Sequence, residues 1–290
     1  MRSIAQSLKE YARGVAGGLM LSLPLLYTME VWWAGFSSHP WRLAAYVVAT
    51  FVLLLGYNYY AGLRRDSCFE EVVIDSVEEM GLGLAIAACV LWLLGRVTFE
   101  MPASESVGQI VVEAMTVAIG VSVGTAQFGG DEDGEDANDK GVGGDDKEAG
   151  RRGASSDEGG IHFAGQCVLA MCGAVLFAAN VAPTEEIIMI AVEISAWRLL
   201  GLAVLSLGLG ALILYYSEFA GAKRHVRFDS HHDMLVGTIV TYAVALLASA
   251  LILTFFGRFD GQSLATCVAQ TVVLGVAATM GASAGRLLLQ

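Results

Sequence analysis

Charged residues are scarce in this chain of 290 residues. Asp, Glu, Lys and Arg together make up 16% of it, whereas 55% is hydrophobic and the mean hydropathy is +0.59. A soluble domain carries about a quarter charged residues. The composition therefore excludes an ordinary soluble globular protein and predicts an all-α, polytopic membrane protein in contact with the lipid bilayer.

Cysteine and recognisable catalytic motifs are also sparse. The five cysteines form no Cys-x-x-Cys pair and their number is odd, which argues against a disulfide framework or a zinc knuckle. The chain has no Walker loop, no dinucleotide fingerprint after a strand, no Gly-x-Ser-x-Gly elbow and no His-Glu-x-x-His. We therefore expect no enzymatic activity, no cofactor and no nucleic-acid partner.

Eight segments are long and apolar enough to cross a bilayer as helices, which takes about 20 residues each. Of the 17 Lys and Arg residues, 13 fall on the side of the two termini. The positive-inside rule then places both termini in the cytoplasm of a multi-pass plasma-membrane protein. The predicted spans are 15–36, 43–62, 78–98, 107–128, 164–192, 198–219, 234–256 and 264–285.

The two halves of the chain resemble each other in sequence. Matching residues recur 156 positions apart, and then 154 positions apart near the start of the third span. Because each half has an even number of predicted spans, the halves share one orientation, with a pseudo-two-fold axis along the membrane normal. The matches at 156 are Thr28-Met-Glu30 with Thr184-Glu-Glu186, Trp41-Arg42-Leu43 with Trp197-Arg198-Leu199, and Tyr59-Tyr60 with Tyr215-Tyr216.

An acidic, glycine-rich segment separates the halves. Residues 129–160 hold 11 Asp/Glu, 4 Lys/Arg and 10 Gly, and almost no apolar residues. Such a segment buries too little surface to offset its ordering entropy, so we predict a disordered cytoplasmic linker. The predicted organisation is thus one four-helix repeat at 1–128, the linker at 129–160 and a second repeat at 161–290.

Two segments carry a resemblance to known proteins. Residues 23–32, LPLLYTMEVW, and residues 180–187, NVAPTEEI, are similar to the hallmark of a bacterial and archaeal family of integral membrane proteins of unknown function. The resemblance covers nearly the whole chain outside the linker. It implies eight helices and assigns no activity.

Carboxylates within the predicted spans are the leading functional candidates, since burying one in a bilayer costs at least ~2.5 kcal/mol. Each half places a proline, a threonine and a carboxylate close together, and a proline inside a helix exposes backbone carbonyls. Oxygen ligands of this kind suit a hard cation or a proton. The predicted ion-binding residues are Glu30, Glu186, Thr28, Thr184, Glu185, Asn180 and Glu113, and the predicted hinges are Pro24 and Pro183.

A second polar cluster is predicted at the cytoplasmic face. Acidic residues before the third span match a His-rich stretch before the seventh, with Glu78 opposite His232 and Glu79 opposite Asp233. Imidazole and carboxylate groups can bind a divalent metal, but acids also simply favour a helix start. His231, His232, Asp233, Glu78 and Glu79 are weak metal candidates on this basis.

Two functions of different classes fit the sequence. The first is a secondary transporter or channel for protons or a small cation, because two like halves can form a central pathway. The second is a membrane sensor or assembly module that acts through its cytoplasmic loops, in which case the polar groups hold helices together. The sequence leaves the oligomeric state open, homo-oligomers included.

Overall fold

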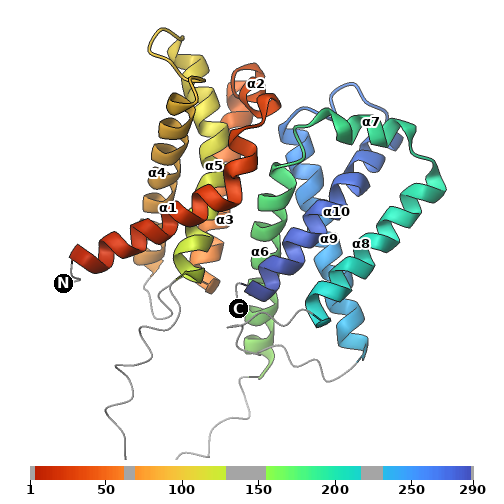
Figure 1. Ribbon diagram of the computed structural model, residues 1–290. Coiled ribbons are helices and arrows are strands. Elements are labelled where there is room, and N and C mark those ends of the chain that lie inside the picture. The colour runs from red at the N-terminus through yellow and green to blue at the C-terminus, as the bar shows by residue number, and fades with distance from the viewer. Residues whose placement is uncertain (1–3, 62–68, 129–154, 217–230, 289–290) are drawn as a thin grey trace, which may run out of the picture.

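A computed structural model describes residues 4–61, 69–128, 155–216 and 231–288, with no side chains described at 4–7, 155–162, 215, 216, 231–234 and 288. The described residues form ten α-helices and no strand (Figure 1). The helices are α1 (Ile4–Leu26), α2 (Met29–Ser37), α3 (Pro40–Ala61), α4 (Phe69–Leu93), α5 (Ala103–Gln127), α6 (Ser155–Ala179), α7 (Glu185–Glu193), α8 (Ala196–Tyr216), α9 (His231–Phe255) and α10 (Leu264–Leu288).

Among the described residues, six helices are long and apolar enough to cross a membrane: α3, α4, α5, α8, α9 and α10. The bent pair α1 and α2 makes a seventh candidate if it counts as one span. The apolar part of α6, Phe163–Ala179, is shorter than the others. The protein is therefore an all-α polytopic membrane protein with six or seven candidate spans. Judged by helix length and composition, this is fewer than the eight spans predicted from the sequence.

Two predicted spans are each divided into two helices. In the segment predicted at 15–36, α1 ends at Leu26 and α2 leaves at an angle of 86°. In the segment predicted at 164–192, α6 ends at Ala179 and α7 begins at Glu185. The predicted hinges at Pro24 and Pro183 implied a bent helix in each segment, whereas the structure has two separate helices, because apolar content shows that a segment suits lipid but does not show where its backbone breaks.

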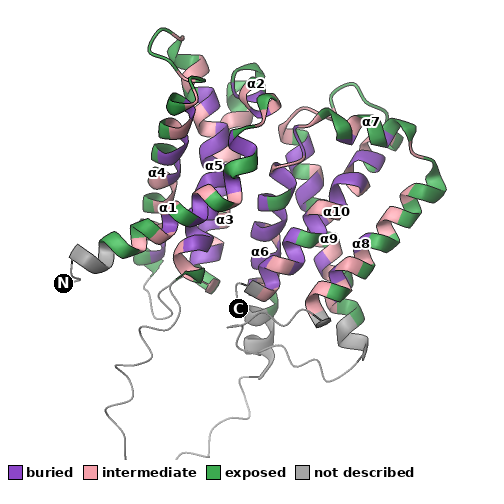
Figure 2. Cartoon of the chain, viewed as in Figure 1, coloured by how far each residue is buried: buried purple, intermediate pink, exposed green. Residues whose placement is uncertain are grey.

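The helices form two groups in chain order, α1 to α5 and α6 to α10 (Figure 1). In the first group α5 packs against each of α1 to α4, and in the second α10 packs against each of α6 to α9. α5 is the more enclosed centre, buried without a break from residue 112 to 124 (Figure 2). α1 begins and α10 ends at the end of the molecule away from α2 and α7 (Figure 1).

Glycines bring the first and last long helices of each group into backbone contact. A Cβ on Gly17 of α1 would lie 2.7 Å from the Gly120 carbonyl oxygen of α5 and would also collide with Gly124. A Cβ on Gly173 of α6 would lie 3.0 Å from the Gly285 Cα of α10 and would collide with Gly281. The Gly-x-x-x-Gly pairs at 120–124 and 281–285 therefore permit close helix packing, as small residues do in membranes.

α4 and α9 end in the same way. Gly95 and Gly257, which follow them, both have φ of 69°. The N–H of the next residue then donates to a carbonyl five residues back, from Arg96 to Leu91 and from Arg258 to Leu253, each at 2.9 Å. This is a Schellman ending, and glycine is favoured because the left-handed backbone leaves no room for a Cβ.

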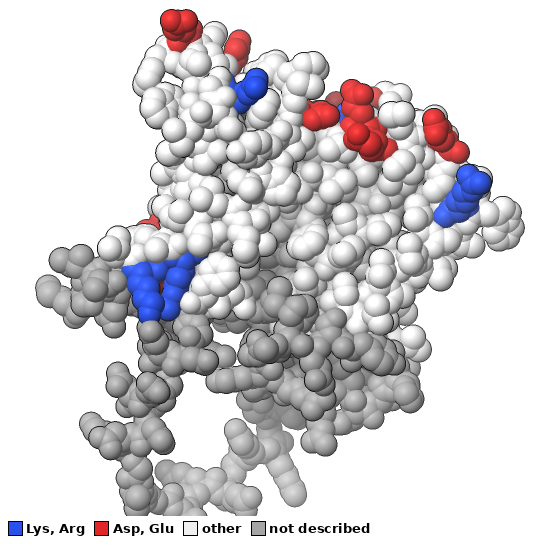
Figure 3. All heavy atoms as spheres, viewed as in Figure 1, with Lys and Arg blue, Asp and Glu red and all other residues white. Residues whose placement is uncertain are grey.

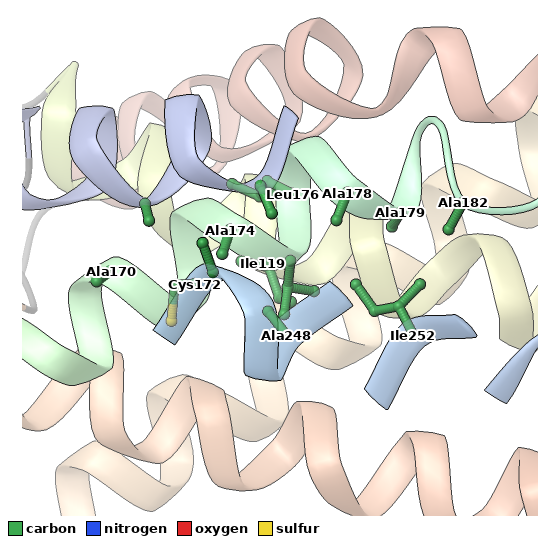
Figure 4. Packing of buried hydrophobic residues seen from close by; sticks show 14 of the residues in the cluster. Ile119, Ala170, Cys172, Ala174, Leu176, Ala178, Ala179, Ala182, Ala248 and Ile252 are labelled. Atoms are coloured by element: carbon green, nitrogen blue, oxygen red, sulfur yellow. The ribbon is translucent and has the colours of Figure 1, made fainter. Parts of the chain in front are cut away.

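The largest buried cluster joins the two groups of helices through α6. It combines residues of α3 and α5 with residues of α6, α9 and α10. Figure 4 shows Ile119 of α5 and Ala248 and Ile252 of α9 beside a run of small residues on α6. Small side chains on α6 allow both groups to approach it closely.

On the surface drawn in Figure 3, charged groups lie toward the ends of the molecule. On the face drawn in Figure 3, Asp and Glu gather at the end where α7 lies, and most of the surface below them is uncharged. Large apolar side chains are exposed along the long helices, among them Val52, Leu84 and Leu251. An uncharged surface of this kind suits lipid tails.

Candidate functional site

The first break in the helices lies three residues after Pro24, which is inside α1. The Thr28 hydroxyl donates to the Pro24 carbonyl at 2.7 Å, and the Thr28 N–H donates to the Leu25 carbonyl at 2.9 Å. Thr28 is also the N-cap residue of α2, with φ −93° and ψ 114° and no side-chain cap bond. The predicted hinge thus contains a full break, and the threonine hydroxyl satisfies a carbonyl there.

The second break is built differently. Pro183 lies in the turn between α6 and α7, so the prediction of a proline inside a helix was wrong here. The Asn180 amide donates to the Leu176 carbonyl at 2.5 Å and to the Leu21 carbonyl of α1 at 3.3 Å. Thr184 is the N-cap of α7 and donates to the Val181 carbonyl. Asn180 and Thr184 therefore bond to backbone carbonyls, and Asn180 ties the two groups of helices together.

The glutamates beside the breaks lie in the first turns of short helices, Glu30 in α2 and Glu185 and Glu186 in α7. Glu185 and Glu186 are exposed and Glu30 is half-buried. Carboxylates are favoured at this position by the positive end of the helix dipole. Their placement at helix starts supports a structural role, in which they stabilise these helices, at least as well as a role in ion binding.

Arg258, in the turn between α9 and α10, links two of these glutamates. Burial lowers the pKa of its guanidinium, and the Glu185 and Glu30 carboxylates act in the opposite direction. Arg42, another arginine at this end of the molecule, pairs with Asp260 at 2.7 Å. The positive charge of Arg258 is thus near one carboxylate from each group of helices. It balances part of their negative charge, so these carboxylates would attract a bound cation less strongly.

Glu113 is the most enclosed of the predicted residues. It lies at the centre of α5 with none of its side chain exposed, and neither of its oxygens has a hydrogen-bond partner. Beside it, the Tyr46 and Thr116 hydroxyls are 3.0 Å apart. A buried carboxylate without a donor is costly, so this group needs a proton or a cation to balance its charge.

Glu79 lies in a polar cluster that the sequence did not predict as a unit. The Asn58 amide donates to Glu79 Oε2 at 2.7 Å and to Ser76 Oγ at 3.0 Å, and Ser122 donates to Asn58 Oδ1 at 3.0 Å. The cluster joins α3, α4 and α5, and Asn58, Ser76 and Ser122 are buried. A search for polar residues inside predicted spans would have found Asn58 and Ser122, but not their contact.

The predicted metal site stays a prediction. The described part of the chain contains no group of three or more His, Cys, Asp or Glu able to hold a metal. The side chains of His231, His232 and Asp233 lie outside the described residues. Glu78 is exposed and accepts a hydrogen bond from the Tyr11 hydroxyl at 3.4 Å.

Comparison with protein families matches the chain over residues 10–289 to DUF2391, a family of integral membrane proteins. The chain belongs to the DUF2391 family. No curated protein and no solved structure matches it. Membership agrees with the resemblance noted in the sequence and with the apolar helices, and it assigns no activity.

Proposed function

We propose that this DUF2391 protein moves protons or a small cation across the membrane, with Glu113 at the centre of the path. The observation that carries the proposal is the full burial of Glu113 in α5 without a hydrogen-bond partner. Intramembrane ionisable residues commonly mark ion paths or proton relays. A purely structural carboxylate would be expected to have a donor, as Glu79 has from Asn58.

Polar groups at several depths of α5 support a path along this helix. Thr116, which lies beside Tyr46, comes three residues after Glu113 in α5. Ser122, which bonds to Asn58 and so joins the Asn58–Glu79 pair, comes six residues after Thr116. Nine residues of helix correspond to about 13.5 Å. Glu113 would receive the ion from the outer end of α5, and Glu79 would pass it toward the inner end.

The residues at the helix breaks fit the entrance to such a path. Glu30, Glu185 and Glu186 would attract cations at the outer face, and Arg258 would limit how strongly they hold them. Thr28, Thr184 and Asn180 would keep the broken backbone satisfied, while Pro24 and Pro183 would set where the chain bends. In this proposal Glu113 alone of the predicted ion-binding residues lies at the centre of the path, and the others lie at its mouth.

We further propose that the two helix groups are tandem repeats with the same orientation in the membrane. The pairs α1–α2 and α6–α7 would each form one membrane crossing, which gives eight crossings in total. Three features support this: the same order of helices, the equivalent glycine crossings, and the matching Schellman endings.

The helix bounds also revise the alignment of the two halves near α4 and α9. α4 and α9 begin 162 residues apart, because residues 217–230 form a longer connection than 62–68. Glu79 then falls opposite Thr241 instead of Asp233.

The test is ion flux in proteoliposomes under imposed gradients of H⁺, Na⁺, K⁺ or Ca²⁺. We expect Glu113→Gln to reduce flux to the level of empty liposomes, since an amide carries no negative charge and releases no proton. Glu105→Gln, in the first turn of the same helix and partly exposed, is the matched control and should keep full flux.

Two results would contradict the proposal. Flux that survives in well-folded Glu113→Gln would remove this residue from the path. A parent protein that moves none of the four ions would favour the sensor or assembly module, and capture of partners through the cytoplasmic loops would then be the next measurement.

A further inference from the structure

Glu113 lies far from both ends of the helix that carries it. It is ten residues from Ala103 and fourteen from Gln127, the two ends of α5, which corresponds to about 15 Å and 21 Å along the helix axis. Its side chain has no exposed surface, and neither of its oxygens has a hydrogen-bond partner. The group that balances this carboxyl must therefore fit among closely packed helices.

The surroundings of Glu113 lack the oxygen ligands that a metal cation needs. Ca²⁺ takes about six to eight oxygen ligands, and K⁺ filters replace the hydration shell of the ion with rings of carbonyls. The part of the chain that the structure describes holds no group of three or more His, Cys, Asp or Glu able to bind a metal. Because α5 is one unbroken helix around Glu113, its carbonyls there are committed to helical hydrogen bonds.

The nearby helix break does not supply these ligands either. Leu25 and Val31, on either side of the break between α1 and α2, pack against Val112, the residue before Glu113. Carbonyls at this break already accept hydrogen bonds, so they are poor candidates for metal ligands. The bonds run from the Thr28 hydroxyl to Pro24, from the Thr28 N–H to Leu25, and from the Trp32 indole N–H to Leu26 at 3.2 Å.

The described helices around α5 bring no positive charge to Glu113. The guanidinium of Arg42 on α3 is paired with Asp260, and the Arg13 backbone on α1 lies beside Gly124, eleven residues further along α5. Over residues 14–26, 29–37, 40–56, 80–93 and 163–179 of these helices, the other titratable side chains are Glu30, Tyr46, Cys89, Cys167 and Cys172, and none of them is a cation. Of these, the Tyr46 phenol interacts electrostatically with Glu113.

Building on the proposed function, we infer that the ion held by Glu113 is a proton, so that the side chain is a neutral carboxylic acid and the path carries protons rather than metal cations. Binding forms one O–H bond on a carboxyl oxygen. Release breaks that bond, passes the proton on along the path and leaves the carboxylate, so no co-reactant is needed. A proton suits this site because it requires a single oxygen, and a neutral acid costs less to bury than an ion.

Dicyclohexylcarbodiimide tests for the proton, because this apolar reagent adds to protonated carboxyl groups and not to carboxylates. The full chain in detergent micelles at pH 7 would be treated with it, and mass spectrometry would give the labelling rate at each glutamate. An ordinary carboxyl exposed to water is only about 0.2% protonated at this pH. We therefore expect Glu113 to be labelled more than ~100-fold faster than Glu105, which is partly exposed in the first turn of the same helix.

Metal cations provide the comparison that separates the two kinds of ion. The labelling would be repeated in NaCl, KCl or CaCl₂ and in N-methylglucamine chloride of equal ionic strength. We expect the rate at Glu113 to be the same in all four, because the site has no ligands for these metals. A metal site would instead be protected about tenfold at ten times its Kd.

Infrared spectroscopy makes the test independent of whether the reagent reaches Glu113. The C=O stretch of a protonated carboxyl is separate from the bands of a carboxylate. We expect Glu113→Gln to lose the intensity of one protonated carboxyl, and Glu105→Gln, the matched control, to keep it. The labelling of the parent protein and its response to cations need no variant, so they hold even if Glu113→Gln folds poorly.

Two results would overturn the inference. One is protection of Glu113 from the carbodiimide by Na⁺, K⁺ or Ca²⁺. The other is an infrared carboxyl band that well-folded Glu113→Gln leaves unchanged. A different result would count against the proposed function alone: if Glu113 is labelled as expected but the parent protein moves no protons in proteoliposomes, the proton site stands and the path does not.

Discussion

The two groups of helices share a framework but bury ionisable groups of opposite kinds. In the first group, α3 to α5 surround the half-buried carboxyl group of Glu79 and the fully buried carboxyl group of Glu113. In the second, α6, α9 and α10 enclose the guanidinium of Arg286. The backbone contacts at the glycine crossings are nearly the same in both. The contrast indicates that packing residues maintain the framework, while a few buried polar residues give each group its own chemistry.

The arginines that follow the two Schellman glycines show the same contrast. Arg96 lies 4.3 Å from the centre of the Trp32 ring, within the first group. Arg258 instead lies within reach of carboxylates from both groups. The two backbones end a helix in the same way, and the neighbouring side chains decide whether the arginine packs on an aromatic ring or joins the groups electrostatically.

The largest effect is expected where helices touch through glycine. Gly17→Leu and Gly173→Leu should each destabilise the protein by more than the ~1–3 kcal/mol of ordinary overpacking, since the new side chain meets backbone. Thermal melting in detergent would measure both variants. If only one of them is destabilised, the two crossings are not equivalent.

Gly81→Ala and Gly208→Ala are the matched controls for the crossings. Both glycines lie inside helices with no atom within 4 Å of an added Cβ. Each alanine should therefore be neutral or stabilise by roughly 0.5–1 kcal/mol through its helix propensity.

An intermediate effect is expected in the Asn58 cluster. Asn58→Leu should cost about 1–3 kcal/mol, because it removes the amide that donates to the Glu79 carboxylate and accepts from the Ser122 hydroxyl. The double variant Asn58→Leu/Glu79→Leu should recover part of that loss, since replacing both partners leaves less unsatisfied. Chemical or thermal unfolding of the three proteins would test this, and no recovery in the double variant would count against a coupled pair.

The second group offers the comparison for this prediction. Gln166→Leu removes one acceptor of Arg286 but leaves the acceptors Gly237 and Thr241. We expect its cost to be smaller, about 1 kcal/mol. If Gln166→Leu lowered the free energy of unfolding more than Asn58→Leu does, the Arg286 cluster would contribute more stability than the Asn58 cluster, contrary to this prediction.

The smallest effect is expected at the exposed ion pair between the groups. Arg42 and Asp260 side chains are 24% and 64% exposed, so their coupling in a double-mutant cycle should stay below about 1 kcal/mol and fall with added salt. Arg198→Gln is the control, because Arg198 also follows a tryptophan near the start of a long helix, α8, and is exposed. A coupling well above that limit would indicate an ion pair shielded from solvent.

Much of the framework could be predicted from the sequence, since it depends on local composition. Apolar length located the segments of all ten helices, and the Gly-x-x-x-Gly spacing at 120–124 and 281–285, where the glycine contacts lie, is visible in the sequence. The break after Pro24 was anticipated as a kink. A hinge was also predicted at Pro183, but not that this proline lies in a turn between two helices, because a proline after the end of a helix and one inside it look alike in sequence.

The linker stays a prediction, as residues 129–154 lie outside the described part of the chain. α6 begins at Ser155, which is inside the predicted linker. The sequence Ser155-Ser156-Asp157-Glu158 has the acidic residues that favour a helix start, although its composition as a whole suggests a loop. A compositional boundary therefore does not give the first residue of the helix.

The sequence by itself determined that this chain is a helical membrane protein, because hydropathy and charge act residue by residue. Only the tertiary structure decided which polar groups meet. Glu79 lies with Asn58 and Ser122, Arg286 with Gln166 and Thr241, and Glu113 without a partner, although each of these residues is equally visible in the sequence. The physical reason is that partners come from different helices, so their contact depends on how those helices pack and rotate.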